Sequence, residues 1–327
     1  MALGPIIGHT ELLSRFGASI AAGRFPQSVL LTGPQGVGKQ RVALWAAQAL
    51  LCEGAEPPCG LCMGCRQVLA LSHPDLHWFV PVARLKATEP DKQVAEVEEA
   101  LAEIMTQRRT DGRWSAPEGA VSHPLASIRL LQRRVALTPF RGPRKVVVLG
   151  DADRLVVQEA SQEAANALLK VLEEPPADTT LILTTAEPQA LLPTVRSRAV
   201  PVRVAPLTDE AARQREAEEP AATPSGDQDR EVDALLAAMK QGPAIWAARA
   251  LRQAPWDARG GYTGLLDALS VRAHGGLKDR ATKGDRAGAG RLAKIVRRVE
   301  TARGEAQGNR NPQLGLAVLL RDMEKLS

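Results

Sequence analysis

A glycine-rich segment near the N-terminus constrains this chain more than any other feature. Residues 33–39 are Gly-Pro-Gln-Gly-Val-Gly-Lys, which fits the phosphate-loop pattern G-x-x-x-x-G-K. An apolar run at 28–32 precedes the loop and a helix-forming stretch at 41–51 follows it. In that context backbone N–H groups and the helix dipole together bind phosphate. We expect a nucleotide-binding loop whose contacts come from Gly33, Gly36, Gly38 and Lys39.

The groups that would bind magnesium beside this loop are missing. The residue after the lysine should be Ser or Thr, whose hydroxyl ligates the metal, but it is Gln40. A strand predicted at 145–149 should end in an acidic residue, but Gly150 follows it. Asp151 and Asp153 come later, and we expect them to begin a solvated turn. We therefore expect no intrinsic ATP hydrolysis, although ATP or ADP could still bind as a ligand that is not hydrolysed.

Short apolar runs recur along the first 205 residues and predict an α/β fold. They lie at 28–32, 76–80, 145–149, 181–185 and 200–204, with helix-like stretches between them. Such alternation is typical of a parallel sheet covered by helices on both faces, with ligands at the carboxyl ends of the strands. Residues 84–122 interrupt the pattern. We expect an exposed helix at 90–109 and a loop at 110–123, forming a solvated insertion without catalytic residues.

The rest of the chain is predicted to be helical. Residues 206–230 are polar and acidic with helix-breaking prolines, which favours a linker. A helix at 233–251, interrupted at Gly242-Pro243, completes a small lid region at 206–253, and 254–327 forms an all-helical domain. Its last helix begins with Asn311 as cap and Pro312 in the first turn. Residues 278–310 hold ten basic and four acidic residues.

All four cysteines lie within 14 residues of one another. Cys52, Cys59, Cys62 and Cys65 have the spacing C-x6-C-x2-C-x2-C. Four thiolates close a tetrahedral zinc site with no open position, so the predicted zinc ion is structural rather than catalytic. Disulfides are a weaker alternative because nothing in the sequence suggests secretion.

Composition agrees with a cytoplasmic protein that does not contact membranes. Of the 327 residues, 44% are hydrophobic and 24% charged, and no apolar run reaches the length of a membrane span. The N-terminus has no basic segment followed by an apolar one, so we expect no signal peptide. The net charge of +5 permits contact with nucleic acid, whereas an aromatic content of 3% argues against base stacking as its main mode.

Several motifs together resemble one known family. They are Ile7-Gly8-His9, Gly23-Arg24-Phe25-Pro26, Ser72-His73-Pro74-Asp75-Leu76, Leu137-Thr138-Pro139-Phe140, the segment 166–176 (NALLKVLEEPP) and Thr194-Val195-Arg196-Ser197-Arg198-Ala199. With the degenerate loop and the cysteines, they resemble the delta-prime family of bacterial DNA polymerase III clamp-loader subunits, which belongs to the AAA+ superfamily. The resemblance covers the whole chain and is strongest in residues 1–205.

The resemblance implies a fold and a role. The fold would be an AAA+ domain (1–205) with an inserted zinc module (52–65), a lid (206–253) and a helical collar (254–327) that holds a ring of five subunits. The partners would be the tau/gamma and delta subunits, which together load a sliding clamp on primed DNA. Arg198 matches an arginine finger that reaches a neighbouring subunit's ATP, Ala199 replaces the family's cysteine, and Thr185 lies near the sensor position.

Two other readings stay open at this point. One is a tau/gamma-type AAA+ ATPase that hydrolyses ATP itself, which Lys39 supports and which Gln40 and Gly150 oppose. The other is a zinc-containing DNA-binding protein that uses the basic stretch 278–310. The motifs do not answer whether nucleotide binds the loop or what the 84–122 insertion does. They also do not say where the lid ends or whether this chain itself contacts clamp or DNA.

Overall fold

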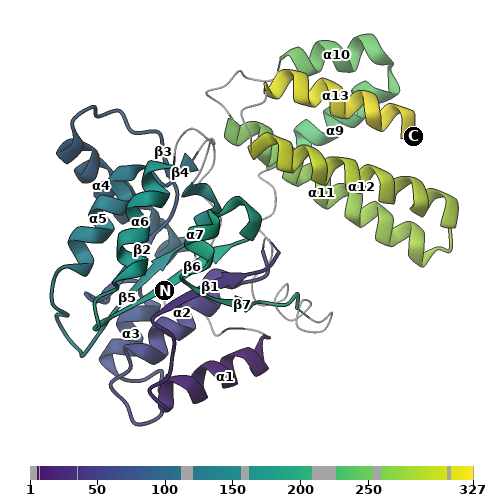
Figure 1. Cartoon of the computed structure of the whole chain (residues 1–327). Helices are drawn as coiled ribbons and strands as arrows, with labels where there is room; N and C mark the ends of the chain where they lie inside the picture. Colours follow the sequence, from purple (N-terminus) through teal and green to yellow (C-terminus); the bar gives the residue numbers. More distant parts are fainter. Residues whose placement is uncertain are drawn as a thin grey trace. The chain divides into compact units, whose positions relative to one another are not determined.

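A computed structural model describes residues 6, 8–34, 36–111, 121–155, 162–207, 226–252, 259–307 and 311–326. The described residues fall into two units, one ending at 207 and one beginning at 226 (Figure 1). We treat each unit by itself.

A parallel sheet forms the centre of the first unit. In the described residues it has five strands, β1 (Ser28–Thr32), β2 (Leu76–Phe79), β5 (Lys145–Leu149), β6 (Thr179–Thr185) and β7 (Val200–Arg203), in the order β2-β5-β6-β1-β7. All five predicted strands are confirmed. Thr32 pairs with Thr185, and Leu149 with Leu183. The carboxyl ends of β1, β5 and β6 therefore meet at one edge of the sheet.

Helices cover both faces of this sheet, as predicted. One face carries α2 (Lys39–Leu50), against which α1 (Thr10–Ala21) and α3 (Met63–Leu69) pack, and the other carries α5 (Leu125–Val135) and α6 (Glu163–Glu173) (Figure 1). Short turns η1 (Ala152–Leu155), η2 (Pro188–Ala190) and α7 (Pro193–Arg196) complete the unit. Helix α6 ends before Pro175, because the residue preceding a proline is driven out of the helical conformation.

The 84–122 insertion is built into the core, so the expectation of a solvated decoration is wrong. Strands β3 (Val82–Ala83) and β4 (Val121–Ser122) pair at its base, and α4 (Pro90–Asp111) packs on α5. Val94, Val97 and Leu101 are buried, because their spacing of three and four residues places them on one face of the helix. Their neighbours are charged, which hid this face in the sequence. Residues 112–120 of the predicted loop lie outside the described residues.

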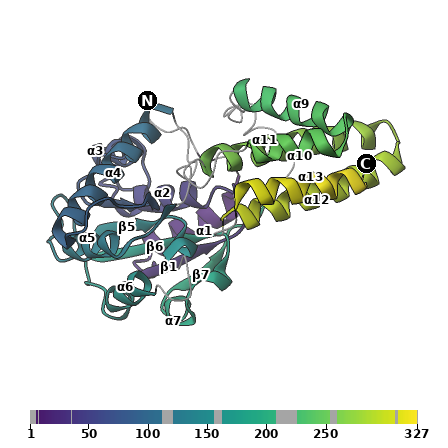
Figure 2. The same cartoon turned by 90° about the horizontal axis from the view of Figure 1, so that it is seen from above.

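The second unit consists of helices throughout its described residues, as predicted. They are α9 (Gly226–Lys240), α10 (Pro243–Leu251), α11 (Arg259–Thr282), α12 (Arg286–Gln307) and α13 (Pro312–Leu326) (Figure 2). The Asn311 side chain accepts a hydrogen bond from the Gln313 N–H at 2.9 Å, which confirms the predicted cap. The helices share one apolar core, and most of the predicted linker lies outside the described residues. No described helix of the chain is long and apolar enough to cross a membrane.

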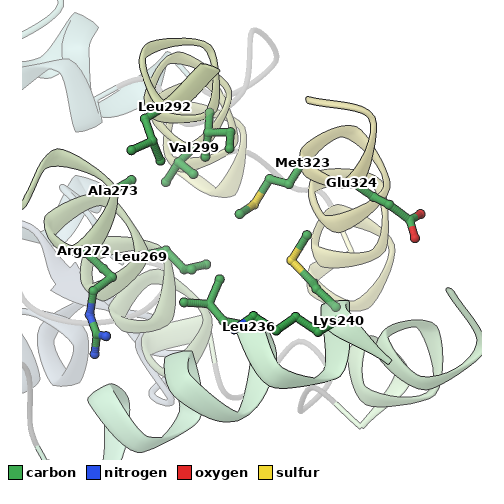
Figure 3. Close-up of a pocket in the computed structure, with 11 residues that line it drawn as sticks. Leu236, Lys240, Leu269, Arg272, Ala273, Leu292, Val299, Met323 and Glu324 are labelled. Carbon is green, nitrogen blue, oxygen red and sulfur yellow. The ribbon is translucent and has the colours of Figure 1, made fainter. Parts of the chain in front are cut away.

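An apolar cavity of about 450 Å³ lies inside this unit, between α9, α11, α12 and α13 (Figure 3). Leu236, Leu269 and Met323 line it, and the charged ends of Arg272 and Glu324 point away from it. Side chains therefore do not fully close the helix interfaces at this place.

The buried face of α4 gives a direct test of the insertion's role in folding. We expect Leu101→Ala to lower the free energy of unfolding by about 3 kcal/mol, because a large side chain that is 7% exposed would leave a cavity. Glu99→Ala, on the exposed face of the same helix, should change it by less than about 0.5 kcal/mol. Chemical denaturation measures both values. If both variants change the free energy of unfolding by the same small amount, α4 is a solvated insertion that does not contribute to the core.

Candidate functional site: a phosphate loop and a cysteine cluster

The glycines of the loop are required by its backbone. Gly36 and Gly38 have φ angles of 75° and 97°, a region that other residues rarely adopt. A Cβ on Gly33 would lie 2.4 Å from the Val204 carbonyl oxygen. Helix α2 begins at Lys39, with no side-chain hydrogen bond capping its first turn. Its N-terminal N–H groups therefore face the loop, in the arrangement that binds anions.

Lys39 lies folded against this loop. Its ammonium group donates to the carbonyl oxygens of Gly33 and Pro34, both at 2.8 Å, and the residue is 6% exposed. Burial lowers the pKa of Lys39, while the nearby carboxylates of Asp151 and Asp153 work in the opposite direction. The lysine is thus held at the loop by hydrogen bonds.

The two positions that have lost their metal ligands touch one another. The Gln40 side-chain amide donates to Asp151 Oδ2 at 3.2 Å, and its Oε1 accepts from the Arg108 guanidinium at 3.0 Å. A Cβ on Gly150 would lie only 3.0 Å from Gln40 Nε2. The large side chain at position 40 therefore uses the space that a side chain at position 150 would need.

Arg108 is the functional candidate that sequence reasoning missed. It lies in the last turn of α4 and is 3% exposed. Burial lowers its pKa to about 10, against the opposing effect of Asp151, so the guanidinium stays charged at neutral pH. A signal was present in the sequence: residue 108 continues the apolar stripe of Val94, Val97 and Leu101. An arginine on the core face of a helix needs a partner, and Gln40 is one.

Asp151 and Asp153 do not begin a solvated turn, so that expectation is wrong. The backbone N–H of Asp151 donates to Thr184 Oγ1 at 3.1 Å, and the Thr185 hydroxyl donates to Asp153 Oδ1 at 2.6 Å. Burial raises the pKa of Asp151, with Asp153 as the next cause. The Asp153 carboxylate thus accepts from a hydroxyl at the end of β6, whereas the Asp151 carboxylate accepts from the Gln40 amide. Thr185, near the expected sensor position, thus contacts the acidic segment.

His123 fixes the backbone at Gly150. Its Nε2 lies 2.8 Å from the Gly150 carbonyl oxygen, and the ring is 2% exposed. Burial lowers the pKa of His123 to about 4, so the ring is neutral at pH 7. Because a carbonyl oxygen only accepts, Nε2 carries the proton and donates it. His123 directly follows β4, the strand at the base of the insertion. It therefore holds the Gly150 backbone, which stands where an acidic residue was expected.

Arg198 lies at the edge of the sheet, just before the edge strand β7. Its guanidinium forms an ion pair with Glu173 at 2.7 Å and donates to the Thr194 carbonyl oxygen at 2.9 Å. The side chain is 33% exposed. The predicted finger residue is therefore positioned by partners in its own subunit and still accessible from outside.

The four cysteines converge as predicted. The sulfur atoms of Cys52, Cys59, Cys62 and Cys65 all lie within 4.8 Å of one another, and none is in a disulfide. Two Sγ–Sγ distances are 3.9 Å (Cys52 to Cys62) and 4.0 Å (Cys59 to Cys65). In a tetrahedron with zinc–sulfur bonds of about 2.3 Å, the sulfur atoms would be about 3.8 Å apart. The cluster therefore has the size and the donors to hold a metal ion.

Backbone N–H groups support the cluster as a site for thiolates. Gly54 donates to Cys52 Sγ, Cys62 to Cys59 Sγ and Cys65 to Cys62 Sγ, each at 3.3 Å. Backbone hydrogen bonds from Cys62 and Leu61 lower the pKa of Cys59 to about 6. Such donors stabilise negative sulfur and orient it toward a bound cation.

The cysteine module is tied to the sheet through two of the sequence motifs. Buried Asp75 accepts hydrogen bonds from the N–H groups of Phe140 at 2.5 Å and Arg141 at 2.8 Å. Arg141 in turn pairs with Glu53 in the module at 2.5 Å. The segments around 72–76 and 137–140 therefore act together to anchor the loop that carries the cysteines.

A known family matches these features. The family model described as DNA polymerase III, delta subunit, matches residues 8–208, which include the phosphate loop, the cysteines and Arg198. The chain belongs to this family. The resemblance to delta-prime subunits predicted from the motifs is confirmed, as is the fold, a parallel sheet flanked by helices with a helical C-terminal region.

Curated relatives carry related names. The chain is 38% identical over 174 residues to DNA polymerase III subunit delta' of Pseudomonas aeruginosa, covering 52% of this chain and 40% of the relative. It is 30% identical over 194 residues to the Bacillus subtilis delta' subunit, covering 59% and 46%. The match to the Salmonella typhimurium tau subunit is 28%, covering 59% and 24%. The chain thus spans less than half of the length of these relatives.

Solved structures give a more distant likeness. A DNA polymerase III gamma subunit-related protein of Thermotoga maritima matches with a TM-score of 0.47 and 18% identity, covering 96% of this chain and 98% of that one.

The contact between positions 40 and 150 can be measured as a coupling. Gly150→Ala should lower the free energy of unfolding by about 1 kcal/mol, because the new Cβ presses on the Gln40 amide. In a Gln40→Ala background the same change should cost close to nothing. Gly142→Ala serves as control, since a Cβ there meets nothing within 4 Å. Strict additivity in this double-mutant cycle would contradict the coupling.

Proposed function

We propose that this family member is an ATPase-silent stator subunit of the DNA replication clamp loader. It assembles with tau/gamma and delta subunits and helps load the sliding clamp on primed DNA. It lends Arg198 to the ATP site of a neighbouring subunit. Family membership and the relatives' names support the complex, and its place of action is the cytoplasm, where the chromosome is replicated.

One observation carries the silent role: this chain's own side chains fill the places of the metal ligands. Gln40 bonds to both Arg108 and Asp151, and a Cβ at position 150 would lie 3.0 Å from the Gln40 amide nitrogen. Hydrolysis of a nucleoside triphosphate relies on a metal that neutralises charge developing on the phosphates. The loop formed by Gly33, Gly36, Gly38 and Lys39 would thus hold ATP or ADP only as a ligand that is not hydrolysed.

The geometry around Arg198 is what a finger acting between subunits requires. Its ion pair with Glu173 is partly exposed, and such pairs contribute little to stability, typically about 0–1 kcal/mol. The arginine can therefore leave Glu173 for a γ-phosphate at low cost. A guanidinium is suited to that target because it donates two parallel hydrogen bonds to phosphate oxygens.

In this proposal each part of the chain has its own role. Residues 1–205 form the AAA+ domain, 206–253 the lid, and 254–327 the collar through which the ring assembles. The cysteine module at 52–65 holds a structural zinc ion through Cys52, Cys59, Cys62 and Cys65. Zinc suits this site because four thiolates leave no open coordination position.

The finger assignment is tested on the reconstituted loader. Arg198→Ala should lower the clamp- and DNA-stimulated ATPase by more than about tenfold, since a trans arginine supplies a large share of transition-state stabilisation. The nearby Arg196→Ala, which removes a charge tied to Gln189, should leave the rate within about twofold. If Arg198→Ala assembles normally and hydrolyses at the wild-type rate, the finger assignment is wrong.

Metal analysis tests the cysteine module. We expect one equivalent of zinc in the purified chain, and its removal by a strong chelator should lower the melting temperature, because metal binding free energy is folding free energy. Cys62→Ser should abolish stoichiometric zinc and make the melting temperature insensitive to chelator. Full zinc content in that variant, or a wild-type melting temperature that chelation leaves unchanged, would contradict a structural zinc site.

A further inference from the structure

A buried cation lies beside the degenerate phosphate loop. The Arg108 guanidinium reaches Gln40 Oε1 at 3.0 Å, across 68 residues of sequence. Gln40 in turn donates to the Asp151 carboxylate at 3.2 Å. Position 40 follows the loop lysine, and Asp151 follows the end of β5, so these residues flank the place at which a phosphate loop usually holds its metal ion.

The oxygen atoms at positions 40 and 150 already accept hydrogen bonds. The Gln40 oxygen already accepts from Arg108, and its amide nitrogen is a donor. Gly150 offers no side chain, and its carbonyl oxygen accepts from His123. A divalent ion that used these oxygens would have to displace the bonds, and one held by the Asp151 carboxylate would lie beside the permanent positive charge of Arg108.

We propose that the Arg108 guanidinium replaces the metal ion, so that the loop binds the phosphates of a nucleoside di- or triphosphate in their metal-free form. The inference rests on the proposed function only in taking this loop as a site for nucleotide that is not hydrolysed. It assigns the α4 insertion a role, because α4 carries the arginine into the site.

The phosphate side of the site remains suited to an anion. Two of the three Lys39 ammonium hydrogens go to Gly33 and Pro34, which leaves the third for a phosphate oxygen. The first turn of α2 has no side-chain cap, and Gly36 and Gly38 hold the loop in its positive-φ conformation. Lys39 and Arg108 together supply two positive charges, whereas a lysine and a divalent metal ion would supply three.

Calorimetric titration of the full chain with ADP and with ATP tests the proposal, once in EDTA and once in excess Mg²⁺. We expect binding in EDTA and at least tenfold weaker binding in Mg²⁺, because the metal-loaded phosphates bring a second cation toward Arg108. Arg108→Ala should weaken metal-free binding at least tenfold, and Arg108→Lys should restore part of it. Arg109→Ala, one residue further along the same helix, removes an equal charge outside the site and should bind as wild type does.

Three results would overturn the proposal: tighter binding in Mg²⁺, no binding under either condition, or unchanged metal-free affinity in a folded Arg108→Ala protein. Circular dichroism and the melting temperature establish whether that variant is folded, and Arg108→Lys provides the test if it is not. None of these results bears on the ATPase of the reconstituted loader with Arg198→Ala. The two proposals therefore fail separately.

Discussion

The parallel register of β1, β6 and β5 fixes the place of the phosphate loop and of the acidic segment beside it. Because Thr32 pairs with Thr185 and Leu149 with Leu183, the phosphate loop, the Gly150–Asp153 segment and the threonines of β6 start from the same edge of the sheet. A shift of register would separate Gln40 from Asp151 and remove the hydroxyl partner of Asp153. The buried, branched side chains of these strands hold that register.

At this edge the balance of charge departs from that of an active phosphate loop. Lys39 and Arg108 lie near Asp151 and Asp153, so two cations and two carboxylates lie close together. Buried charges of this kind are stable only when they are paired and hydrogen-bonded, and Gln40 links the arginine to the carboxylate. The loss of the metal ligands is thus more than a deletion, since other side chains have taken over the space and part of the charge.

Much of this could be predicted from sequence because the signals are local. The loop glycines, the strands at 28–32 and 145–149 and the cysteine spacing all depend on residues close together in the chain. Arg108 and the carboxylates at 151 and 153 were misjudged for the opposite reason. Their environment depends on contacts between residues far apart in the chain: Arg108 with Gln40 across 68 residues, and Asp151 with Gln40 across 111. A charged residue in a polar helix also gives little sign that it faces a core. The apolar stripe of α4 was the available clue.

The central claim is that this phosphate loop carries its own cation and does not take a metal. Electron paramagnetic resonance of Mn²⁺ with ADP measures this directly, because protein-bound Mn²⁺ loses the sharp signal of the free ion. With wild-type chain the signal should be at least as strong as that of Mn²⁺ and ADP alone, because a chain that binds metal-free ADP releases Mn²⁺ from its complex with ADP. In a variant that removes Arg108 and restores both ligands (Arg108→Ala, Gln40→Thr, Gly150→Asp) the signal should fall as the metal binds. A wild-type chain that depletes the signal as strongly as this variant would contradict the account.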